Sequence, residues 1–505
     1  MGVSVRGLSS SSDIHKEFLD APTVCVFGAG FSGLLAALRL RDLCPDLHVL
    51  VVEKTVPESN TQLSGMRIRL GKPHLRQDPV GEITALFARR NDGVVTDRMR
   101  RFATVLVAEL AHWQGIPGFV AHSDRQEWFG PQWGAPNRAG HGRGRSVLDW
   151  LRRAATRAGV EFVHATLRRL DVAGDRVSSA LVVLPDGTPA LLDAETYVLA
   201  SGSAAGLLFS STNKKIHWSG HEVAFDSGIP LNGSTLHMVH PFGNSDAHGA
   251  SRVGCMETDL LAESTVRVTK EDGSSFTDED ATDLLARHAA HDHFPELASR
   301  LSAYRQPLRL SHPDGRETYA RVAQHYHHLG IRTVDGLRIS GLRNAYAVGD
   351  AGGIGYWTNF RERQPGFALS KCLVDAALLA GLIGTAPPAD RARLRSPEAA
   401  DLWPRSSGAS RAATIARLAP LNTRHLFSLL RQHDVAGRVS AAKAWANELR
   451  GLMYRHGPTG LGLLSLAMAD AHTLTTTSAT EPIDLGRETA LASLYCVPGP
   501  AVVAR

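Results

Sequence analysis

Short apolar runs and helical spacing of apolar positions alternate in the first part of the chain. Residues 24–27 and 49–52 are continuously apolar, and the pattern predicts strand, helix and strand over about residues 23–58. Apolar positions at helical intervals predict two further helices, over 96–115 and 146–158. This order of elements indicates an α/β fold.

The period changes from residue 160 onward. Four short apolar segments are separated by turn signals at Gly174-Asp175 and Asp186-Gly187, which predicts a small antiparallel meander. These segments are residues 160–165, 167–173, 178–185 and 189–195. A strand over 197–200 then enters Ser201-Gly202-Ser203, a second passage from a strand into a glycine turn.

The later chain predicts an insertion and a helical end. Residues 242–322 are more polar, with helical patterning at 279–303, and predict an inserted α+β capping domain. A strand at 345–348 enters a glycine-rich turn and a helix over 366–384, in which the apolar run 373–383, interrupted by Asp375, reads as buried. The expected domains are a loose leader (1–22), a discontinuous cofactor domain (23–241 and 323–385), the cap (242–322), a helical domain after a Pro-rich joint (386–475) and a tail (476–505).

The first strand leads into glycines in GxGxxG spacing at Gly28, Gly30 and Gly33. The first permits a tight turn, the second a close approach of the backbone to a pyrophosphate, and the third close packing of the helix that begins near Ser32. Glu53 ends the second strand, where it would accept hydrogen bonds from a ribose. The spacing predicts a Rossmann-like dinucleotide site, with an ordinary glycine turn as the alternative.

Composition narrows the class of protein. A chain of 505 residues is expected to form two or three domains, and its net charge of +5 is spread out, which argues against nucleic acid as a partner. The five cysteines are scattered and never in CxxC spacing, so we expect a reducing cytoplasm. No run of 18 apolar residues occurs, so we expect no membrane partner.

Three glycine motifs, GAGFSG, VLASGSA and AYAVGDAGG, resemble those of the flavoprotein family of succinate dehydrogenase, fumarate reductase and L-aspartate oxidase, over about residues 23–475. Met238-Val239-His240-Pro241 is similar to the family's QFHP, and Leu285-Ala286-Arg287 falls where its cap carries LAxRD. His325-Tyr326 with Leu329-Gly330-Ile331 is similar to HYxxGGI. Arg361 follows Gly349 by twelve residues, as the family's arginine does.

The resemblance implies FAD as the cofactor, with Asp350 near the ribityl chain. Ser59-Asn60-Thr61 occupies the segment where succinate dehydrogenase has SHT, whose histidine bonds covalently to FAD. Asparagine cannot form that bond, so we expect dissociable, non-covalent FAD. The expected cofactor contacts are Gly28, Gly30, Phe31, Ser32, Gly33, Glu53, Lys54, Asn60, Thr61, Ala200, Ser201, Gly202, Gly349, Asp350, Ala368 and Leu369.

A cationic, hydrogen-bond-donating pocket is expected over the flavin. Arg361, or Arg363 in its place, would grip a substrate carboxylate with both guanidinium nitrogens, and His240 and His325 would donate to a second anionic group. Arg287 resembles the family's proton carrier on the cap, or acts as an electrostatic clamp. The expected reaction is oxidation of a carboxylate-bearing small molecule by hydride transfer to flavin N5, most similar to L-aspartate oxidase, with oxygen or another electron acceptor.

Departures from the family leave alternatives open. His288 replaces the aspartate after the cap arginine, and Trp357 and Phe360 near the clamp suggest a more apolar pocket. The alternatives are an ene reductase similar to fumarate reductase, a biosynthetic oxidase of a larger, more apolar substrate, and a flavoprotein that has lost catalysis. No metal is expected, although the histidines at 325, 327 and 328 keep a metal site as an alternative, and a homo-oligomer stays open.

Overall fold

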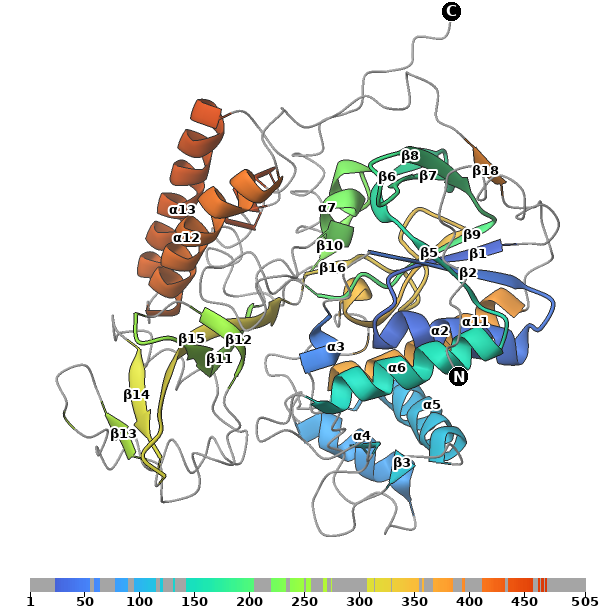
Figure 1. Cartoon of the computed structure of the whole chain (residues 1–505), viewed down its shortest axis with the longest axis horizontal. Coiled ribbons are helices and arrows are strands. Elements are labelled where there is room, and N and C mark those ends of the chain that lie inside the picture. The colour runs from blue at the N-terminus through green and yellow to red at the C-terminus, as the bar shows by residue number, and fades with distance from the viewer. Residues whose placement is uncertain are drawn as a thin grey trace, which may run out of the picture. The chain divides into compact units, whose positions relative to one another are not determined.

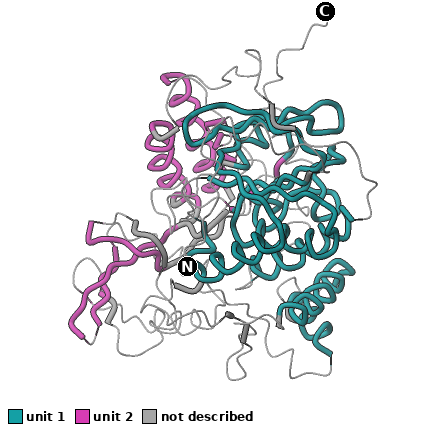
Figure 2. Tube along the Cα trace, turned by 45° about the vertical axis from the view of Figure 1, so that its right-hand side comes forward, with its two compact units in different colours: residues 1–202, 219–230, 330–404 teal, residues 203–218, 231–329, 405–505 magenta. Residues whose placement is uncertain are grey.

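The computed structural model describes part of the chain in detail, and its contacts divide the chain into two compact units (Figure 2). Unit 1 comprises residues 1–202, 219–230 and 330–404, and unit 2 comprises residues 203–218, 231–329 and 405–505. The described residues are 23–54, 59–63, 78–89, 95–114, 119–120, 130–131, 142–203, 219–232, 237–248, 251–255, 267–269, 274, 307–312, 314–327, 329–353, 357, 367–384, 393–395, 411–431, 435–456, 462–463, 465–466 and 468–469.

A parallel sheet forms the centre of unit 1, in the strand order β17-β9-β1-β2-β5 (Figure 1). Its strands read as continuous apolar runs because both faces are covered, and Val24, Cys25, Val26 and Phe27 are all at most 3% exposed. The strands are β1 (Thr23–Phe27), β2 (His48–Glu53), β5 (Glu161–His164), β9 (Thr196–Leu199) and β17 (Ala345–Ala347).

One strand differs from the sequence-based expectation. The segment 160–165 was expected in the antiparallel meander, but β5 pairs in parallel with β2, with Val51 opposite Phe162 and Glu53 opposite His164. Periodicity within a segment indicates a strand without identifying its partner, and parallel partners are joined by long crossovers. The segment therefore forms an edge of the parallel sheet, and that expectation was wrong.

Helices cover one side of the parallel sheet in Figure 1. The helices expected over 96–115 and 146–158 are confirmed as α5 and α6. Aromatic rings pack together between these helices. The centre of the Phe102 ring lies 5.4 Å from the centres of the Phe87 and Trp357 rings and 5.2 Å from that of the Phe367 ring. The helices are α2 (Phe31–Leu43), α3 (Asn60–Leu63), α4 (Pro79–Arg89), α5 (Asp97–Gln114), α6 (Gly142–Arg157) and α11 (Phe367–Gly384).

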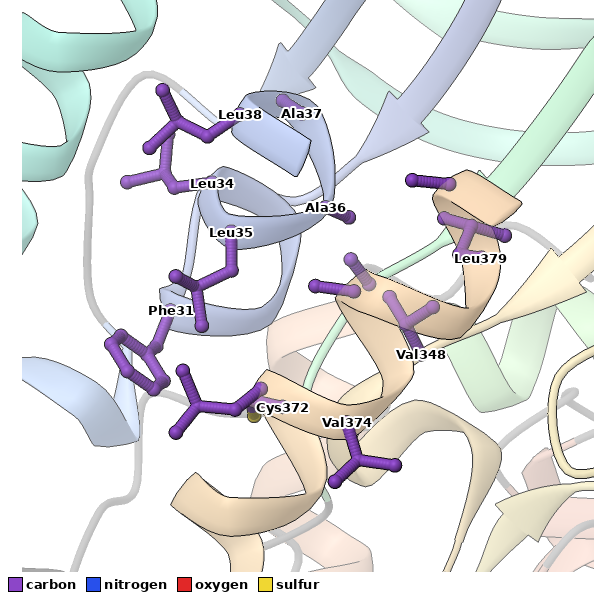
Figure 3. Close-up of a cluster of buried hydrophobic side chains, with 14 of the residues drawn as sticks. Phe31, Leu34, Leu35, Ala36, Ala37, Leu38, Val348, Cys372, Val374 and Leu379 are labelled. Atoms are coloured by element: carbon purple, nitrogen blue, oxygen red, sulfur yellow. The ribbon is translucent and has the colours of Figure 1, made fainter. Parts of the chain in front are cut away.

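Helices α2 and α11 contribute many side chains to one buried hydrophobic cluster (Figure 3). Leu34 and Leu35 of α2 are almost fully buried, as are Leu373 and Leu379 of α11. α11 is long and apolar enough to cross a membrane by length and composition. Its burial against α2 confirms the expectation of a core helix.

The meander is confirmed over its other three segments. Strands β6 (Thr166–Ala173), β7 (Arg176–Val183) and β8 (Pro189–Asp193) pair antiparallel through turns in which Gly174 and Gly187 have φ of 61° and 88°. A fourth strand, β18 (Arg393–Arg395), joins β8 from the Pro-rich stretch. The buried Asn344 side chain joins this sheet to the parallel one, because its amide bonds both backbone groups of Val177, at 2.9 Å, and donates to the Glu195 carbonyl.

Unit 2 holds a second antiparallel sheet and a helical pair. The strand order of the sheet is β12-β11-β15-β14-β13. The two helices are α12 (Arg411–Arg431) and α13 (Val435–His456). Trp445 of α13 joins them, because its Nε1 donates to Asn422 of α12 at 3.0 Å. The patterning at 279–303 lies outside the described residues. The strands are β11 (His237–Ser245), β12 (Ser251–Cys255), β13 (Arg267–Thr269), β14 (Leu308–Ser311) and β15 (Glu317–His327).

Short elements complete the described chain: β3 (Phe119–Val120), β4 (Gly130–Pro131), α7 (Ser219–Asp226), β10 (Leu231–Asn232), β16 (Gly330–Ile331) and the 3₁₀ turn η2 (Gly349–Gly352). The expected fold class is confirmed: a mixed α/β fold with a parallel sheet, separate antiparallel sheets and a helical C-terminal region.

Candidate functional site

The first glycine turn is compressed between neighbouring strands. Gly28 has a φ of 121°, and a Cβ there would lie 2.5 Å from the carbonyl oxygen of Ala200. Its N–H donates to the Val52 carbonyl at 2.8 Å, while the Ala200 N–H donates to that of Phe27 at 2.9 Å. Only glycine satisfies both the conformation and the space, so the turn is fixed at the carboxyl ends of β1, β2 and β9.

Two glycines at the amino terminus of α2 have different surroundings. A Cβ on Gly33 would lie 1.9 Å from the Gly28 carbonyl oxygen, whereas the nearest described atom to a Cβ on Gly30 is Thr61 Oγ1, at 4.0 Å. Gly30 is the N-cap and provides no side-chain cap, although the Phe31 N–H donates to Thr61 Oγ1 at 3.4 Å. Among the described residues, Thr61 Oγ1 is thus the group nearest to the Gly30 Cβ position, and the positive end of the α2 dipole lies there, a geometry that suits a phosphate.

A buried carboxylate lies at the end of β2. The Glu53 side chain is only 6% exposed, and its Oε1 is bound by Arg152 of α6 and lies 3.5 Å from His164 Nδ1. The Arg152 guanidinium also lies over the Phe162 ring, 4.5 Å from its centre. The Glu53 side chain is thus held in place, with oxygen lone pairs that can accept from sugar hydroxyls. Lys54, the next residue, is exposed.

The second strand-to-turn passage lies beside the first. β9 ends at Leu199, Ala200 is buried, and Gly202 has a φ of 75°. Ser201 lies against α7 so closely that a Cβ on Gly220 would be 1.9 Å from Ser201 Oγ. Ala200, Ser201 and Gly202 therefore continue the carboxyl edge of the sheet.

The glycine segment after β17, which contains Gly349, lies against the first turn of α2. Gly349, after β17, has a φ of 62°, and a Cβ there would lie 2.6 Å from Ser32 Cβ. Asp350 follows at the start of η2 and is partly buried. The structure thus brings three segments that are distant in sequence to the carboxyl ends of parallel strands, the edge at which open α/β sheets bind ligands.

These residues fit FAD. The amino terminus of α2 suits the pyrophosphate, Glu53 suits the adenosine ribose, and Asp350 supplies an acceptor for further sugar hydroxyls. Asn60 and Thr61 lie on α3, beside the first amide of α2, and Ala368 and Leu369 lie in the first turn of α11. The individual contacts of all the expected residues with the cofactor stay predictions.

The predicted substrate residues are placed only in part. His240 and His325 lie on the neighbouring strands β11 and β15, where His240 is opposite Ala323 and Met238 is opposite Tyr326. A register shift between Met238 and Val239 leaves His325 without a ladder partner in this pairing. Arg287, Arg361 and Arg363 lie outside the described residues.

Trp357 corrects one expectation. The sequence suggested that it makes the substrate pocket more apolar, but its side chain is 1% exposed and packs against Phe102 in the core of unit 1. Its Nε1 donates to Asp375 at 3.3 Å. Trp357 is therefore a core residue, and Phe360 lies outside the described residues.

Sequence reasoning missed the charged residues that support the site. Arg152 and His164 approach Glu53 from α6 and β5, and their spacing from Glu53 gives no local signal. Lys371 and Asp375 form a buried ion pair on α11, behind Gly349. Burial raises the pKa of Asp375, and the Lys371 ammonium opposes that shift. The available signal was two opposite charges four residues apart in an otherwise apolar helix.

Comparisons with known proteins agree with this geometry. Residues 23–352 match the family model described as DAO, FAD dependent oxidoreductase. No curated protein matches the chain.

Three solved structures share the fold. The Mycobacterium smegmatis Sdh1 complex in the apo form is 15% identical, with a TM-score of 0.61 over 95% of this chain and 88% of that one. A variant of E. coli quinol fumarate reductase FrdA is 14% identical, with a TM-score of 0.58 over 90% and 87%. A quinol-fumarate reductase with menaquinol molecules is 13% identical, with a TM-score of 0.60 over 91% of each chain.

Proposed function

The chain belongs to the FAD dependent oxidoreductase family, and from this premise we propose that it oxidises a carboxylate-bearing small molecule, as an enzyme similar to L-aspartate oxidase. The observation that carries the proposal is the meeting of the Gly28, Ala200 and Gly349 segments at one edge of the parallel sheet. That edge of the sheet is the argument for FAD as the cofactor. The motifs around His240, Arg287, His325 and Arg361 supply the argument for the substrate.

FAD, when bound, supplies a ring whose N5 accepts a hydride from a substrate C–H bond, and the two electrons then pass to oxygen or another acceptor. The protein's own contribution is placement. Arg361 or Arg363 would hold both oxygens of a carboxylate, and an imidazole from His240 or His325 would donate to a second polar group. Two such anchors restrict the rotation of a small acid, and positioning of this kind contributes strongly to rate.

The pairing of β11 with β15 supports the histidine pair. Their backbone positions lie on adjacent strands, so two imidazoles from segments more than eighty residues apart belong to one sheet. Arg287 adds a cation that would stay protonated at neutral pH, which suits an electrostatic clamp.

Anaerobic titration tests the proposal. The purified protein, loaded with FAD, is mixed with amino acids and dicarboxylates without oxygen, and the visible flavin absorption is followed. We expect bleaching by at least one α-amino or dicarboxylic acid. In an Arg361→Lys variant, reduction slows by about tenfold or more, because lysine cannot make the two-pronged contact.

Arg338→Lys is the matched control, since Arg338 is an exposed arginine paired with Asp335 in the same unit. It should leave the reduction rate unchanged. If no acid in the panel bleaches the flavin, the substrate assignment fails.

The second candidate is an ene reductase that takes electrons from a partner. It is favoured by the structural similarity to two quinol fumarate reductases. Oxygen consumption with peroxide formation supports the oxidase, whereas alkene reduction driven by a reduced dye supports the reductase. The third candidate, an oxidase of a larger apolar substrate, loses the support of Trp357, which is buried in the core.

A further inference from the structure

Lys371 and Asp375 form an ion pair inside the core helix α11. Their side chains are 1% and 0% exposed, one helical turn apart. Burying two charges is costly unless they are paired and their remaining hydrogen-bonding groups are satisfied. An apolar helix that packs on α2 does not need such a pair for its stability, so its bonds to other groups are informative.

Those bonds converge on Gly349. Lys371 Nζ donates to the Gly349 carbonyl at 2.7 Å, and the Gly349 N–H donates to Asp375 Oδ2 at 2.8 Å. The other carboxylate oxygen, Oδ1, accepts from Trp357 Nε1 at 3.3 Å. Both backbone polar groups of one residue are therefore held by one side-chain pair.

Gly349 occupies a place where small shifts matter. It precedes Asp350, it has a φ of 62°, and a Cβ on it would lie 2.6 Å from Ser32 Cβ in the first turn of α2. The position of Gly349 thus sets the separation between η2, which carries Asp350, and the helix terminus that faces the pyrophosphate position.

We propose that Lys371 and Asp375 are positioning residues for FAD, which hold Gly349 so that Asp350 and the amino terminus of α2 can contact the same cofactor molecule. The inference rests on the FAD assignment of the site and is independent of the substrate. It makes the affinity for FAD depend on a pair of side chains that lie behind the binding surface.

Removing both charges together is the informative change, because a single substitution leaves an uncompensated buried charge and endangers folding. The double variant Lys371→Met/Asp375→Leu removes the pair. A second double variant, Lys371→Met/Asp375→Asn, keeps an acceptor for the Gly349 N–H. Leu379→Ala is the control, since Leu379 lies on the same helix, is fully buried and belongs to the same core cluster.

Three quantities are measured for each protein: the FAD dissociation constant of the apo-protein by fluorescence quenching, the thermal midpoint without FAD, and amide hydrogen exchange of residues 349–352. We expect the Met/Leu variant to bind FAD at least about fivefold more weakly than the Leu379→Ala variant, with faster exchange at Gly349. The Met/Asn variant should recover part of the loss.

A dissociation constant within about fivefold of the Leu379→Ala value overturns the positioning role and leaves a purely structural pair. If the Met/Leu variant does not fold, the Met/Asn variant takes its place, and amide exchange at Gly349 no faster than in Leu379→Ala overturns the positioning role. Failure of the unsubstituted protein to bind FAD would refute the FAD assignment instead.

Discussion

The Arg152 guanidinium binds the carboxylate of Glu53 at the carboxyl end of β2, although the two residues lie on α6 and β2 and are almost a hundred positions apart. Glu53 is nearly buried while Arg152 is about one-third exposed. The pair holds the Glu53 side chain in a fixed orientation at the position where the adenosine ribose is expected.

Glu53→Gln should therefore weaken FAD binding by about tenfold to a hundredfold, the effect of losing charge-assisted hydrogen bonds from the ribose. Fluorescence titration of the apo-protein measures this change. Glu161→Gln is the control, because Glu161 is a largely exposed glutamate on the adjacent strand β5. Equal affinities in the two variants would remove Glu53 from the cofactor site.

Gly28 and Gly30 should respond differently to alanine. Gly28→Ala places a Cβ 2.5 Å from the Ala200 carbonyl oxygen at a φ of 121°, so we expect the apo-protein to be destabilised by about 1–3 kcal/mol or more. In Gly30→Ala the nearest atom of the described residues to the new methyl group is Thr61 Oγ1, at 4.0 Å, so the apo-protein should keep its thermal midpoint.

The same Gly30→Ala variant should lose most of its FAD affinity, because its methyl group occupies the space in front of the helix terminus. Thermal denaturation and FAD titration of both variants test this contrast. A Gly30→Ala variant that binds FAD normally would show that the phosphates lie elsewhere.

FAD should leave the protein on denaturation. Asn60 stands in the segment where a covalently attached flavin would need a histidine, and its amide is not a nucleophile. Denaturing the loaded protein and filtering it should place all yellow colour in the filtrate. Flavin fluorescence that migrates with the polypeptide on a denaturing gel would contradict this expectation.

Acid should weaken the helical pair of unit 2 through Glu448. A hydrogen bond with His425, whose Nε2 lies 2.5 Å from Oε2, lowers the pKa of Glu448, and Arg424 adds to the shift. The unfolded chain therefore binds a proton more readily than the folded one. The stabilisation is complete above the ordinary pKa of about 4.5 and is lost as the pH falls through the lower, folded value.

Glu448→Gln should consequently flatten the fall in thermal midpoint below that pH, by a modest amount because the carboxylate is about half exposed, at most about 1 kcal/mol. Circular dichroism melts across acidic pH measure it. Asp97→Asn, at an exposed ion pair on α5, is the control and should leave the profile unchanged. A steep profile that survives in Glu448→Gln would place the acid-sensitive group elsewhere.

The sequence predicted those parts of the fold that depend on contacts between residues close together in the chain. Gly28, Gly30 and Gly33 follow an apolar strand directly, so the turn, the helix start and Glu53 could be read from neighbouring residues. The partner of β5 could not, because a parallel pairing joins segments separated by a long crossover. β18 has only three residues, which is too short for a periodicity.

The charged side chains that support the site could not be identified from neighbouring residues either. The sequence shows Asp375 as a charge in an apolar run, four residues after Lys371, but nothing near it indicates that its other partners are Gly349 and Trp357. Arg152 belongs to an arginine-rich helix, and only the fold selects it for Glu53. Which charge is buried, and against what, is decided by tertiary contacts.

Two neighbouring strands of the parallel sheet are far apart in the chain, because β9 ends at Leu199 and β17 begins at Ala345. During translation, the glycine turn and its first strands therefore emerge from the ribosome well before the strand and helix that complete them. Until then the nascent chain exposes an unpaired strand edge and the apolar surface of α2, the kind of intermediate that chaperones bind. A cofactor site that includes Asp350 is therefore complete only after β17 and η2 have been synthesised.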